Sequence, residues 1–272
     1  MKKLGVIAGS GELPAAVAGE ARALGYTVTA IGLDGITDPA LSSCVDEIRW
    51  INIGKLGALI DTLKKAGISE AVFAGKVHKS VIYRGKVVPD MRLVRLFFSL
   101  RDKSDDSIML AITGELESEG IHLLNTTDFT AGLMAPEGVL TKKKPSEDDY
   151  RDIAFGWRIA REIGRLDIGQ TVVVRNLAVM AIEAIEGTDE AIRRGGALAG
   201  SDAVVVKISK PQQDMRFDVP VVGTDTLGSM AAVKARVLAI EAGKSILLNR
   251  AAFVREADRA RIIVVGYRGP GN

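Results

Sequence analysis

The sequence predicts an α/β protein with two α/β domains joined by a linker, and three observations lead to this. Short β-branched runs alternate with amphipathic stretches of helical period along the whole chain. A polar segment interrupted by prolines lies near the middle of the sequence. The length of 272 residues suits two domains of about 130 residues each, although one large α/β domain would also accommodate it.

The first half predicts a Rossmann-like nucleotide-binding domain over residues 1–133. An apolar stripe of helical spacing precedes the third expected strand, at Leu56, Leu59, Ile60 and Leu63. The order βαβαβ indicates a parallel sheet with helices on both faces. In chain order, strands are expected at 6–8, 27–31, 71–74 and 121–124, and helices at 14–24, 56–65, 91–100 and 106–119.

The second half repeats the alternation after a linker at 134–148, which predicts a second α/β domain over 149–272. Ser146, with Asp149 three residues on, is expected to cap a long helix that ends near residue 164. Gly243-Lys244-Ser245 resembles the end of a P-loop, but Leu238 stands where the first glycine belongs. Gly243 is therefore expected to end a helix. Strands are expected at 171–175, 203–208, 219–222, 245–248 and 262–265, and helices at 188–194, 229–242 and 251–259.

Composition excludes several classes of function. The formal net charge is +2 and the basic residues are scattered, so nucleic acid is not an expected partner. One cysteine and two histidines argue against disulfides and against a zinc or multi-histidine metal centre. Any bound metal would use oxygen ligands, which favours Mg²⁺. The longest uncharged stretch, 23–33, is too short to span a bilayer, and no signal peptide is evident, so we expect a cytoplasmic protein.

A glycine turn follows the first expected strand. Gly9-Ser10-Gly11 leads into Leu13 and Pro14, so backbone N–H groups and the positive end of a helix converge there, an arrangement that suits phosphate. Such turns also occur in α/β proteins that bind nothing at this point. A dinucleotide site is the narrower alternative: Asp34 lies where a ribose-binding acid would, but Pro14 replaces the third glycine of the fingerprint.

A second turn, Gly75-Lys76, follows the strand expected at 71–74. In a doubly wound sheet it lies near the first glycine turn, at the carboxyl ends of the strands. Lys76 is then either a contact for phosphate or a solvated loop lysine.

Acidic residues at three places permit both a structural and a functional interpretation. Asp105 and Asp106 begin an expected helix, so they either cap it or bind a ribose, a divalent ion or a substrate hydroxyl. Thr188 likewise suits a helix cap, whereas Asp189 beside it suits an oxygen-ligand Mg²⁺ site. Asp218 lies in an apolar extended run, where aspartate is disfavoured, and it needs either an ion pair with Arg216 or a chemical role.

Several strings of residues together resemble one known family. They are Leu4-Gly5-Val6-Ile7-Ala8-Gly9-Ser10-Gly11-Glu12-Leu13-Pro14, Phe73-Ala74-Gly75-Lys76-Val77, Asp105-Asp106, Ala160-Arg161-Glu162-Ile163-Gly164-Arg165-Leu166-Asp167-Ile168-Gly169-Gln170, Glu186-Gly187-Thr188-Asp189, Lys207, Lys210-Pro211, Gln213 and Arg216-Phe217-Asp218-Val219-Pro220. On these strings the chain resembles, over nearly its whole length, the LpxI-type UDP-2,3-diacylglucosamine pyrophosphatases of lipid A biosynthesis.

The resemblance implies two α/β domains with a substrate held between them and a requirement for Mg²⁺. The implied reaction is hydrolysis of UDP-2,3-diacylglucosamine to UMP and 2,3-diacylglucosamine 1-phosphate (lipid X). The family's essential aspartate matches Asp218, and the lipid-linked substrate implies a transient contact with the inner membrane surface. The 149–272 domain would then be the catalytic one.

Chemistry suggests roles for the other candidates. A pyrophosphate carries charge that must be neutralised before water attacks. The substrate-binding candidates are Gly9, Ser10, Gly11, Leu13, Gly75, Lys76, Asp105, Asp106, Thr188, Lys207 and Lys210. Of these, the glycine turns and Lys76 would hold the UMP half, and Lys207 and Lys210 would offset charge on the pyrophosphate. Asp218, with Asp189 as the weaker candidate, would bind Mg²⁺ or orient the attacking water.

Two other functions stay open on the sequence alone. One is an NAD(P)-binding oxidoreductase, favoured by Gly9, Gly11 and Asp34. The other is a non-catalytic protein that binds a sugar nucleotide or a lipid. A homo-oligomer is possible under any of these functions.

Overall fold

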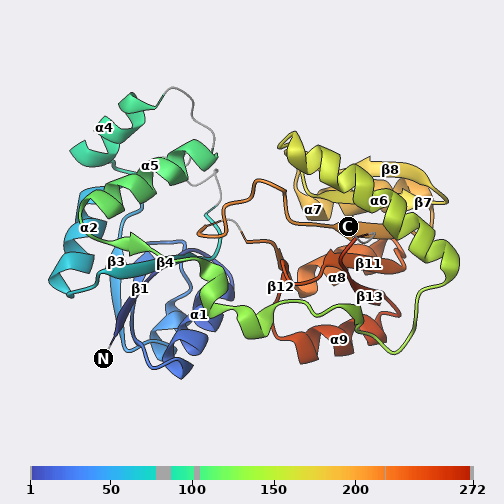
Figure 1. Cartoon of the computed structure of the whole chain (residues 1–272), viewed down its shortest axis with the longest axis horizontal. Helices are drawn as coiled ribbons and strands as arrows, with labels where there is room; N and C mark the ends of the chain where they lie inside the picture. Colours follow the sequence, from blue (N-terminus) through green and yellow to red (C-terminus); the bar gives the residue numbers. More distant parts are fainter. Residues whose placement is uncertain (1, 78–86, 101–104, 218, 270–272) are drawn as a thin grey trace. The chain divides into compact units, whose positions relative to one another are not determined.

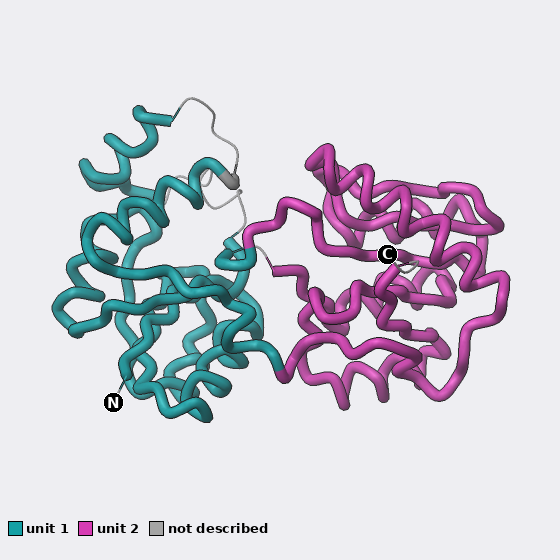
Figure 2. The backbone as a smooth tube through the Cα atoms, in the orientation of Figure 1, with its two compact units in different colours: residues 1–131, 215–217 teal, residues 132–214, 218–272 magenta. Residues whose placement is uncertain are grey.

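The chain folds into two compact units (Figures 1 and 2). Unit 1 comprises residues 1–131 and 215–217, and unit 2 comprises 132–214 and 218–272. This computed structural model describes residues 2–77, 87–100, 105–217 and 219–269. The expected α/β class, with a parallel sheet in the N-terminal part, is confirmed.

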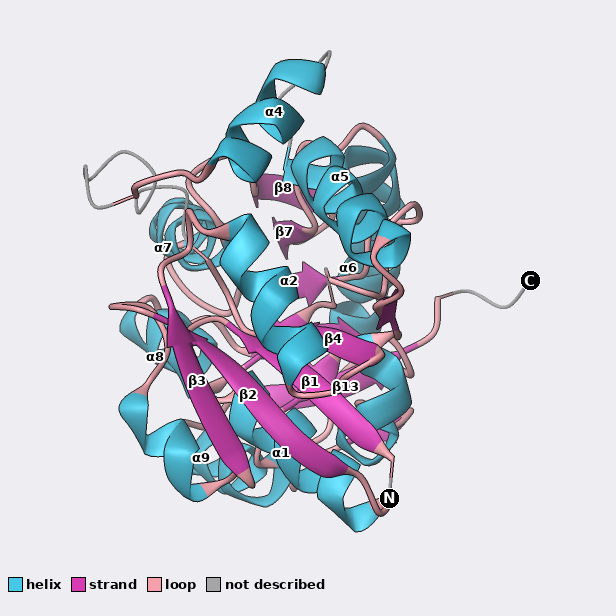
Figure 3. Ribbon diagram, turned by 90° about the vertical axis from the view of Figure 1, so that its left-hand side faces the viewer, coloured by secondary structure: helices cyan, strands magenta, loops and turns pink. Residues whose placement is uncertain are grey.

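Unit 1 contains a parallel sheet of five strands in the order β3-β2-β1-β4-β5. Figure 3 shows β3, β2, β1 and β4 side by side. The order reverses at β1, so the switch point lies between β1 and β4, where open α/β sheets bind ligands outside the carboxyl ends of the strands. The strands are β1 (Lys3–Ala8), β2 (Thr27–Leu33), β3 (Glu47–Ile51), β4 (Glu70–Ala74) and β5 (His122–Leu123).

Helices cover the unit 1 sheet because its central strands β1, β2 and β4 are apolar on both faces. The helices are α1 (Leu13–Ala23), α2 (Leu56–Lys65), α4 (Met91–Ser99) and α5 (Asp105–Ser118). Ile7 and Ile31 of the sheet pack into one cluster with apolar residues of α2, α4 and α5. Helix α1 packs on β1, β2 and β4 through Val17, Ala18 and Ala21, all fully buried.

An ion-pair network joins the helices on one face of unit 1. Glu119, just beyond α5, accepts hydrogen bonds from Lys64 Nζ of α2 and Arg92 Nη2 of α4, each at 2.5 Å. Arg92 Nε also donates to Glu115 Oε2 at 2.7 Å. Hydrogen bonds from Lys64, which has the larger effect, and from Arg92 lower the pKa of Glu119 from 4.5 to about 2. The network therefore depends on an ionised Glu119.

Unit 2 contains a mixed six-stranded sheet in the order β6-β13-β11-β9-β7-β8. Strands β9, β11 and β13 are parallel, whereas β7 is antiparallel to β8 and β9. The strands are β6 (Gly138–Val139), β7 (Thr171–Arg175), β8 (Ala178–Ile182), β9 (Val204–Lys207), β11 (Val237–Glu241) and β13 (Ile263–Tyr267), and a separate parallel pair is formed by β10 (Val221–Val222) and β12 (Ile246–Leu247).

Helices also cover both faces of the unit 2 sheet. The helices are α6 (Glu147–Arg165), α7 (Thr188–Ala199), α8 (Thr224–Ala232) and α9 (Arg250–Arg259). Helix α6 packs on one face, and α7, α8 and α9 pack on the other. The predicted cap of α6 is confirmed, because Ser146 and Asp149 form a reciprocal capping box. Buried Asp149 also pairs with Arg236, so the start of α6 is fixed to the chain just before β11.

The helix expected at 229–242 is wrong. Helix α8 ends at Ala232, Lys234 turns with φ +55°, and 237–241 form the buried strand β11 between β9 and β13. A short apolar run is equally consistent with a buried strand and a buried helix segment, and neighbouring strands decide between them here. Gly243 accordingly follows a strand, with φ +75°, and does not end a helix.

Other differences concern short or peripheral elements. Within the segment expected as a linker, β6 pairs with β13 and belongs to the unit 2 sheet. Strands β3 and β8 lie at sheet edges and were not among the expected strands: β3 alternates polar and apolar residues, and β8 is an apolar run whose first two residues are exposed. In the ranges that the structure describes, no helix is long and apolar enough to span a bilayer.

Replacing Glu119 with Gln should destabilise the protein at neutral pH, and the difference from wild type should vanish in acid. The folded pKa of Glu119, about 2, lies below the ordinary 4.5. Its contribution is therefore present above about pH 4.5 and is lost as pH falls toward 2. Urea unfolding of both proteins at a series of pH values measures this. Glu20→Gln on α1, whose carboxylate has no partner within the described residues, serves as the control; a difference that is constant with pH would contradict the network.

Candidate functional site

Unit 1 joins the loop after β1 directly to the loop after β4. Ser10 N donates to Lys76 O at 2.8 Å, and Lys76 N donates to Ser10 O at 3.0 Å. Ser10 Oγ also donates to Lys76 O at 2.9 Å, and Gly9 N donates to Ala74 O at 2.7 Å. The structure therefore brings together the two glycine turns that the sequence analysis selected.

Glycines are required because the two loops approach so closely. A Cβ on Gly9 would lie 2.6 Å from Lys76 O, and a Cβ on Gly75 would lie 2.6 Å from Ser10 O. Gly75 also has φ +91°, which other residues rarely adopt. The loop contact thus accounts for both glycines, and the N–H groups of Gly9 and Ser10 are already used.

The backbone groups that remain for an anion lie in the first turn of α1. The N–H groups of Gly11, Glu12, Leu13 and Ala15 have no acceptor within the described residues. They lie at the positive end of the helix dipole. Leu13 has a buried side chain, so only its backbone can serve. The exposed Lys76 side chain, likewise without a described partner, belongs to the adjoining loop.

The candidates Asp105 and Asp106 begin α5, as the capping interpretation expects. Their side chains are outside what the structure describes, so their choice between capping and binding stays a prediction.

Unit 2 has a polar network at the edge of its sheet where β9 and β11 end and β7 begins. Lys207, the last residue of β9, is 6% exposed. Its Nζ donates to Thr188 Oγ1 at 3.1 Å, and Thr188 Oγ1 donates to Glu183 Oε1 at 2.9 Å. Glu183 Oε2 also accepts from Gln170 N at 3.3 Å. The chain of contacts fixes the direction of a buried ammonium group.

Thr188 therefore does not act as the expected cap. Gly187, with φ +84°, is the residue before α7, and Thr188 is the first residue of the helix. Of the acids around it, Glu186 pairs with Arg194, which lowers its pKa, and Glu190 pairs with Arg193. These two carboxylates therefore already have arginine partners at the surface of the molecule.

A second set of contacts surrounds the end of β11. Glu241 Oε2 accepts from Ser209 N at 2.8 Å, and Glu241 Oε1 lies 3.0 Å from Lys244 Nζ. Lys210, a predicted substrate ligand, contacts Asp167 at 2.6 Å. Lys207 ends β9 and Lys210 follows it, but their surroundings differ: Lys207 is buried, whereas Lys210 is paired with a half-exposed acid.

Four buried polar atoms at this edge have no hydrogen-bond partner within the described residues: Gln170 Oε1, Asp189 Oδ1, Gln213 Nε2 and Ser245 Oγ. They come from the segments before β7, after β8, after β9 and after β11. Buried polar groups in proteins are almost always paired, so each of these atoms is a candidate contact for water, an ion or a ligand.

The residues at this edge fit Mg²⁺ only if the ion keeps most of its coordinating waters. Within the described residues, no group of three or more His, Cys, Asp or Glu side chains could hold a metal ion. Asp189 has one buried oxygen without a partner in the described residues, so it could supply one carboxylate. Mg²⁺ commonly keeps several waters and uses one or two carboxylates with substrate phosphates, which this edge can supply.

Asp218 lies outside the described residues, so neither its role nor an ion pair with Arg216 is tested. Its neighbours 215–217 belong to unit 1, and the chain returns to unit 2 after Phe217. Buried Thr126 holds this segment: its N–H donates to Met215 O at 3.1 Å, and its Oγ1 lies 3.0 Å from Arg216 O. Arg216 Nη1 lies 3.5 Å from Glu117 Oε1.

Family models account for almost the whole chain. The LpxI N-terminal domain matches residues 3–133, and the LpxI C-terminal domain matches residues 136–265. The chain belongs to the LpxI family.

One LpxI relative covers the chain nearly end to end. It is the UDP-2,3-diacylglucosamine pyrophosphatase LpxI of Caulobacter vibrioides, 32% identical over 277 residues, with 98% of each chain covered.

Two solved structures resemble part of this LpxI chain. N5-carboxyaminoimidazole ribonucleotide synthetase from Thermotoga maritima is 17% identical, covering 68% of this chain and 42% of that one, with a TM-score of 0.26. The biotin carboxylase domain of Hydrogenobacter thermophilus 2-oxoglutarate carboxylase is 14% identical, covering 73% and 41%, with a TM-score of 0.27. Scores this low support no conclusion on fold or activity.

Sequence reasoning missed Glu183 and Glu241, which hold the network of this LpxI protein together. A signal was present: each acid comes at the end of an apolar strand, as Lys207 does. A charged residue that ends a buried strand needs a partner at that edge.

Replacing Gly75 with Ala should destabilise unit 1 more than the same change at Gly25. Both glycines have positive φ, +91° and +86°, which costs alanine about 1–2 kcal/mol. Only at Gly75 would the new Cβ meet backbone, because nothing lies within 4 Å of the position at Gly25. Urea unfolding of Gly75→Ala and Gly25→Ala compares the two; equal losses would show that the loop contact is not tight.

Proposed function

We propose that this protein hydrolyses the pyrophosphate bond of UDP-2,3-diacylglucosamine, giving UMP and 2,3-diacylglucosamine 1-phosphate in lipid A biosynthesis. The supporting observation is full-length membership of the LpxI family, with a relative of that named activity at 32% identity. The reaction adds water across one P–O–P linkage, so each product carries one of the two phosphates.

Unit 1 suits the UMP half of this substrate. The unused N–H groups at Gly11, Leu13 and Ala15, together with Lys76, provide a phosphate contact at the switch point of the sheet. Ser10, Gly9 and Gly75 act indirectly, since their contacts shape the two loops.

Unit 2 suits the reacting phosphates. Buried Lys207 would stabilise charge that develops on a phosphate oxygen, because a fixed ammonium shielded from water interacts strongly with it. Lys210 is the weaker candidate, since it already contacts Asp167. Asp218 matches the family's essential aspartate, and it would either bind Mg²⁺ or orient the attacking water. Mg²⁺ held by Asp218 and Asp189 would neutralise charge on the pyrophosphate.

The acyl chains of the substrate suggest a cytoplasmic protein that contacts the inner membrane surface transiently. NAD(P) binding is the second candidate, favoured by the strand order of unit 1 and by Asp34 after β2. Pro14 in place of the third glycine argues against it.

The purified protein should release UMP from UDP-2,3-diacylglucosamine, and EDTA should abolish release until Mg²⁺ is restored. Asp218→Ala should lower kcat by at least about 100-fold. In a thermal-shift assay, UMP should raise the melting temperature and NADPH should not, because only ligands of the folded state stabilise it. If the protein releases no UMP and NADPH raises its melting temperature, the hydrolase proposal fails and the oxidoreductase class is favoured. If Asp218→Ala keeps full activity, Asp218 is not a catalytic residue.

Thr188→Val should lower kcat by about tenfold or more with little change in KM, since Lys207 loses the oxygen that aims its ammonium group. Thr188→Ser keeps that hydroxyl and should restore most of the rate. Thr113→Val, at a buried threonine of α5 whose hydroxyl has no partner within the described residues, is the matched control and should leave kcat unchanged. If Thr188→Ser is as slow as Thr188→Val, the hydroxyl does not position Lys207.

A further inference from the structure

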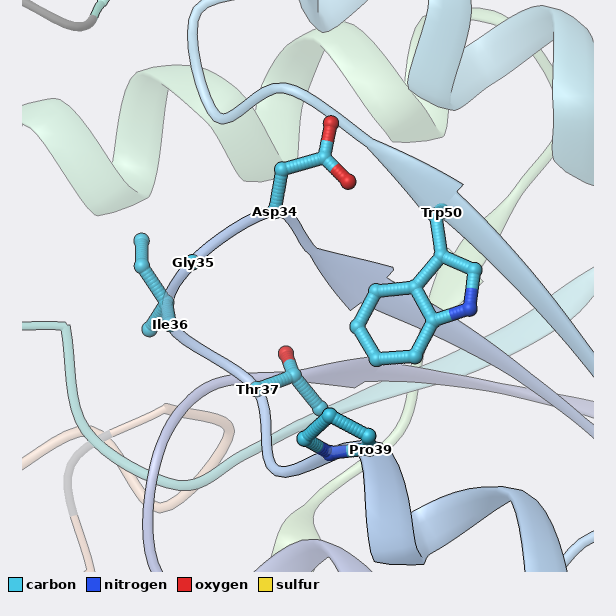
Figure 4. A pocket seen from close by; sticks show the side chains of 6 residues that line it. All are labelled: Asp34, Gly35, Ile36, Thr37, Pro39 and Trp50. Carbon is cyan, nitrogen blue, oxygen red and sulfur yellow. The ribbon is translucent and has the colours of Figure 1, made fainter.

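A cavity of about 530 Å³ lies in unit 1 near the ends of β2 and β3 (Figure 4). It is lined by Asp34, Gly35, Ile36, Thr37, Pro39 and Trp50. Its volume falls within the range of small-molecule sites, and it is broadly open to solvent. None of these residues has a part in the hydrolysis described above, so the cavity requires its own explanation.

One wall of the cavity is an indole ring held against the sheet. Trp50 of β3 is paired in register with Gly32 of β2. A Cβ on Gly32 would come within 2.7 Å of two carbons of the six-membered ring, so only glycine lets the indole lie this close. The side chain remains 41% exposed and lines the cavity. An aromatic surface fixed in this way offers a flat partner for another ring.

The opposite part of the cavity carries a carboxylate on a fixed loop. Asp34 N donates to Ile51 O at 2.9 Å. Thr37 Oγ1 accepts from Leu33 N at 2.8 Å and donates to Ala8 O at 2.5 Å, so the loop is fastened at both ends of its turn. The exposed carboxylate of Asp34 has no partner within the described residues, and in Figure 4 it projects toward the same space as Trp50.

This combination selects the chemistry of the ligand. A carboxylate repels phosphate but accepts hydrogen bonds from two neighbouring hydroxyls. The indole, with Ile36 and Pro39, suits a flat, weakly polar ring. The bond from Thr37 to Ala8 also places the cavity loop against the residue before Gly9, so a phosphate at α1 and a ribose at Asp34 belong to one edge of the sheet.

We infer that this cavity binds the nucleoside of the UDP-sugar, with the base stacked on Trp50 and the ribose hydroxyls bound by Asp34. The inference rests on the proposed function for the identity of the base. It assigns Trp50 and Asp34 as substrate-binding residues that take no part in the chemical step.

Tryptophan fluorescence tests the stacking directly, because the chain has two tryptophans and the other, Trp157, is buried in unit 2. Titration of the full-length wild type with UMP should quench emission saturably, whereas Trp50→Phe should show no quenching. In kinetics with UDP-2,3-diacylglucosamine, Trp50→Ala should raise KM about tenfold and leave kcat nearly unchanged. Equal quenching in wild type and Trp50→Phe would overturn the stacking, as would quenching of the wild type by AMP but not by UMP.

The ribose contact has a separate measurement. Wild type should bind UMP about tenfold more tightly than dUMP, and Asp34→Ala should bind the two equally. Asp61→Asn, at an exposed acid of α2 that does not line the cavity, should keep the preference. A preference unchanged in Asp34→Ala would overturn the ribose assignment.

Failure of this inference is distinguishable from failure of the proposed function. If wild type releases UMP but neither emission nor the KM of Trp50→Ala changes, the nucleoside lies elsewhere and the hydrolase proposal stands. If UMP quenches Trp50 but no hydrolysis occurs, the cavity binds a nucleotide and the hydrolase proposal fails.

Discussion

Strands covered by helices on both faces have no room for polar side chains along their length, and this constraint determines where the chemistry of both units lies. In unit 2, β9 consists of three buried valines followed by Lys207, and β11 stays apolar until Glu241. In unit 1, β1 is buried from Leu4 to Ala8, and the first glycine turn begins at Gly9, directly after the strand. Parallel neighbours bring such endpoints to one edge of the sheet, so polar groups far apart in sequence become neighbours there.

The two edges differ in what they can do. The unit 1 edge is built from backbone: two loops exchange hydrogen bonds, and the first turn of α1 offers N–H groups beside an open cavity. Such an edge suits the binding of a ligand. The unit 2 edge instead buries a lysine that contacts Thr188, which in turn contacts the buried Glu183. Desolvated charge of this kind acts more strongly on a phosphate than an exposed lysine could.

Much of this arrangement could be predicted from the sequence. The helix at 56–65 and the α6 cap are local patterns and were found with their bounds, and both glycine turns were found because glycine between strand and helix is distinctive. Strand β11 was taken for a helix because a short apolar run carries no period of its own. The roles of Thr188 and Glu183 depend on Lys207 from another strand, which only the folded sheet brings near. Trp50 could not be recognised because its significance depends on its register with Gly32.

We propose that the nucleotide binds at the edge of unit 1 where β1, β2 and β4 end. Hydrogen exchange of the full-length protein, followed by mass spectrometry with and without saturating UMP, tests it most directly. The account predicts slower exchange in peptides that cover the start of α1, the 34–37 loop and Lys76, with little change at the surface helix α9. Protection confined to unit 2, with the α1 and 34–37 peptides unchanged, would contradict it.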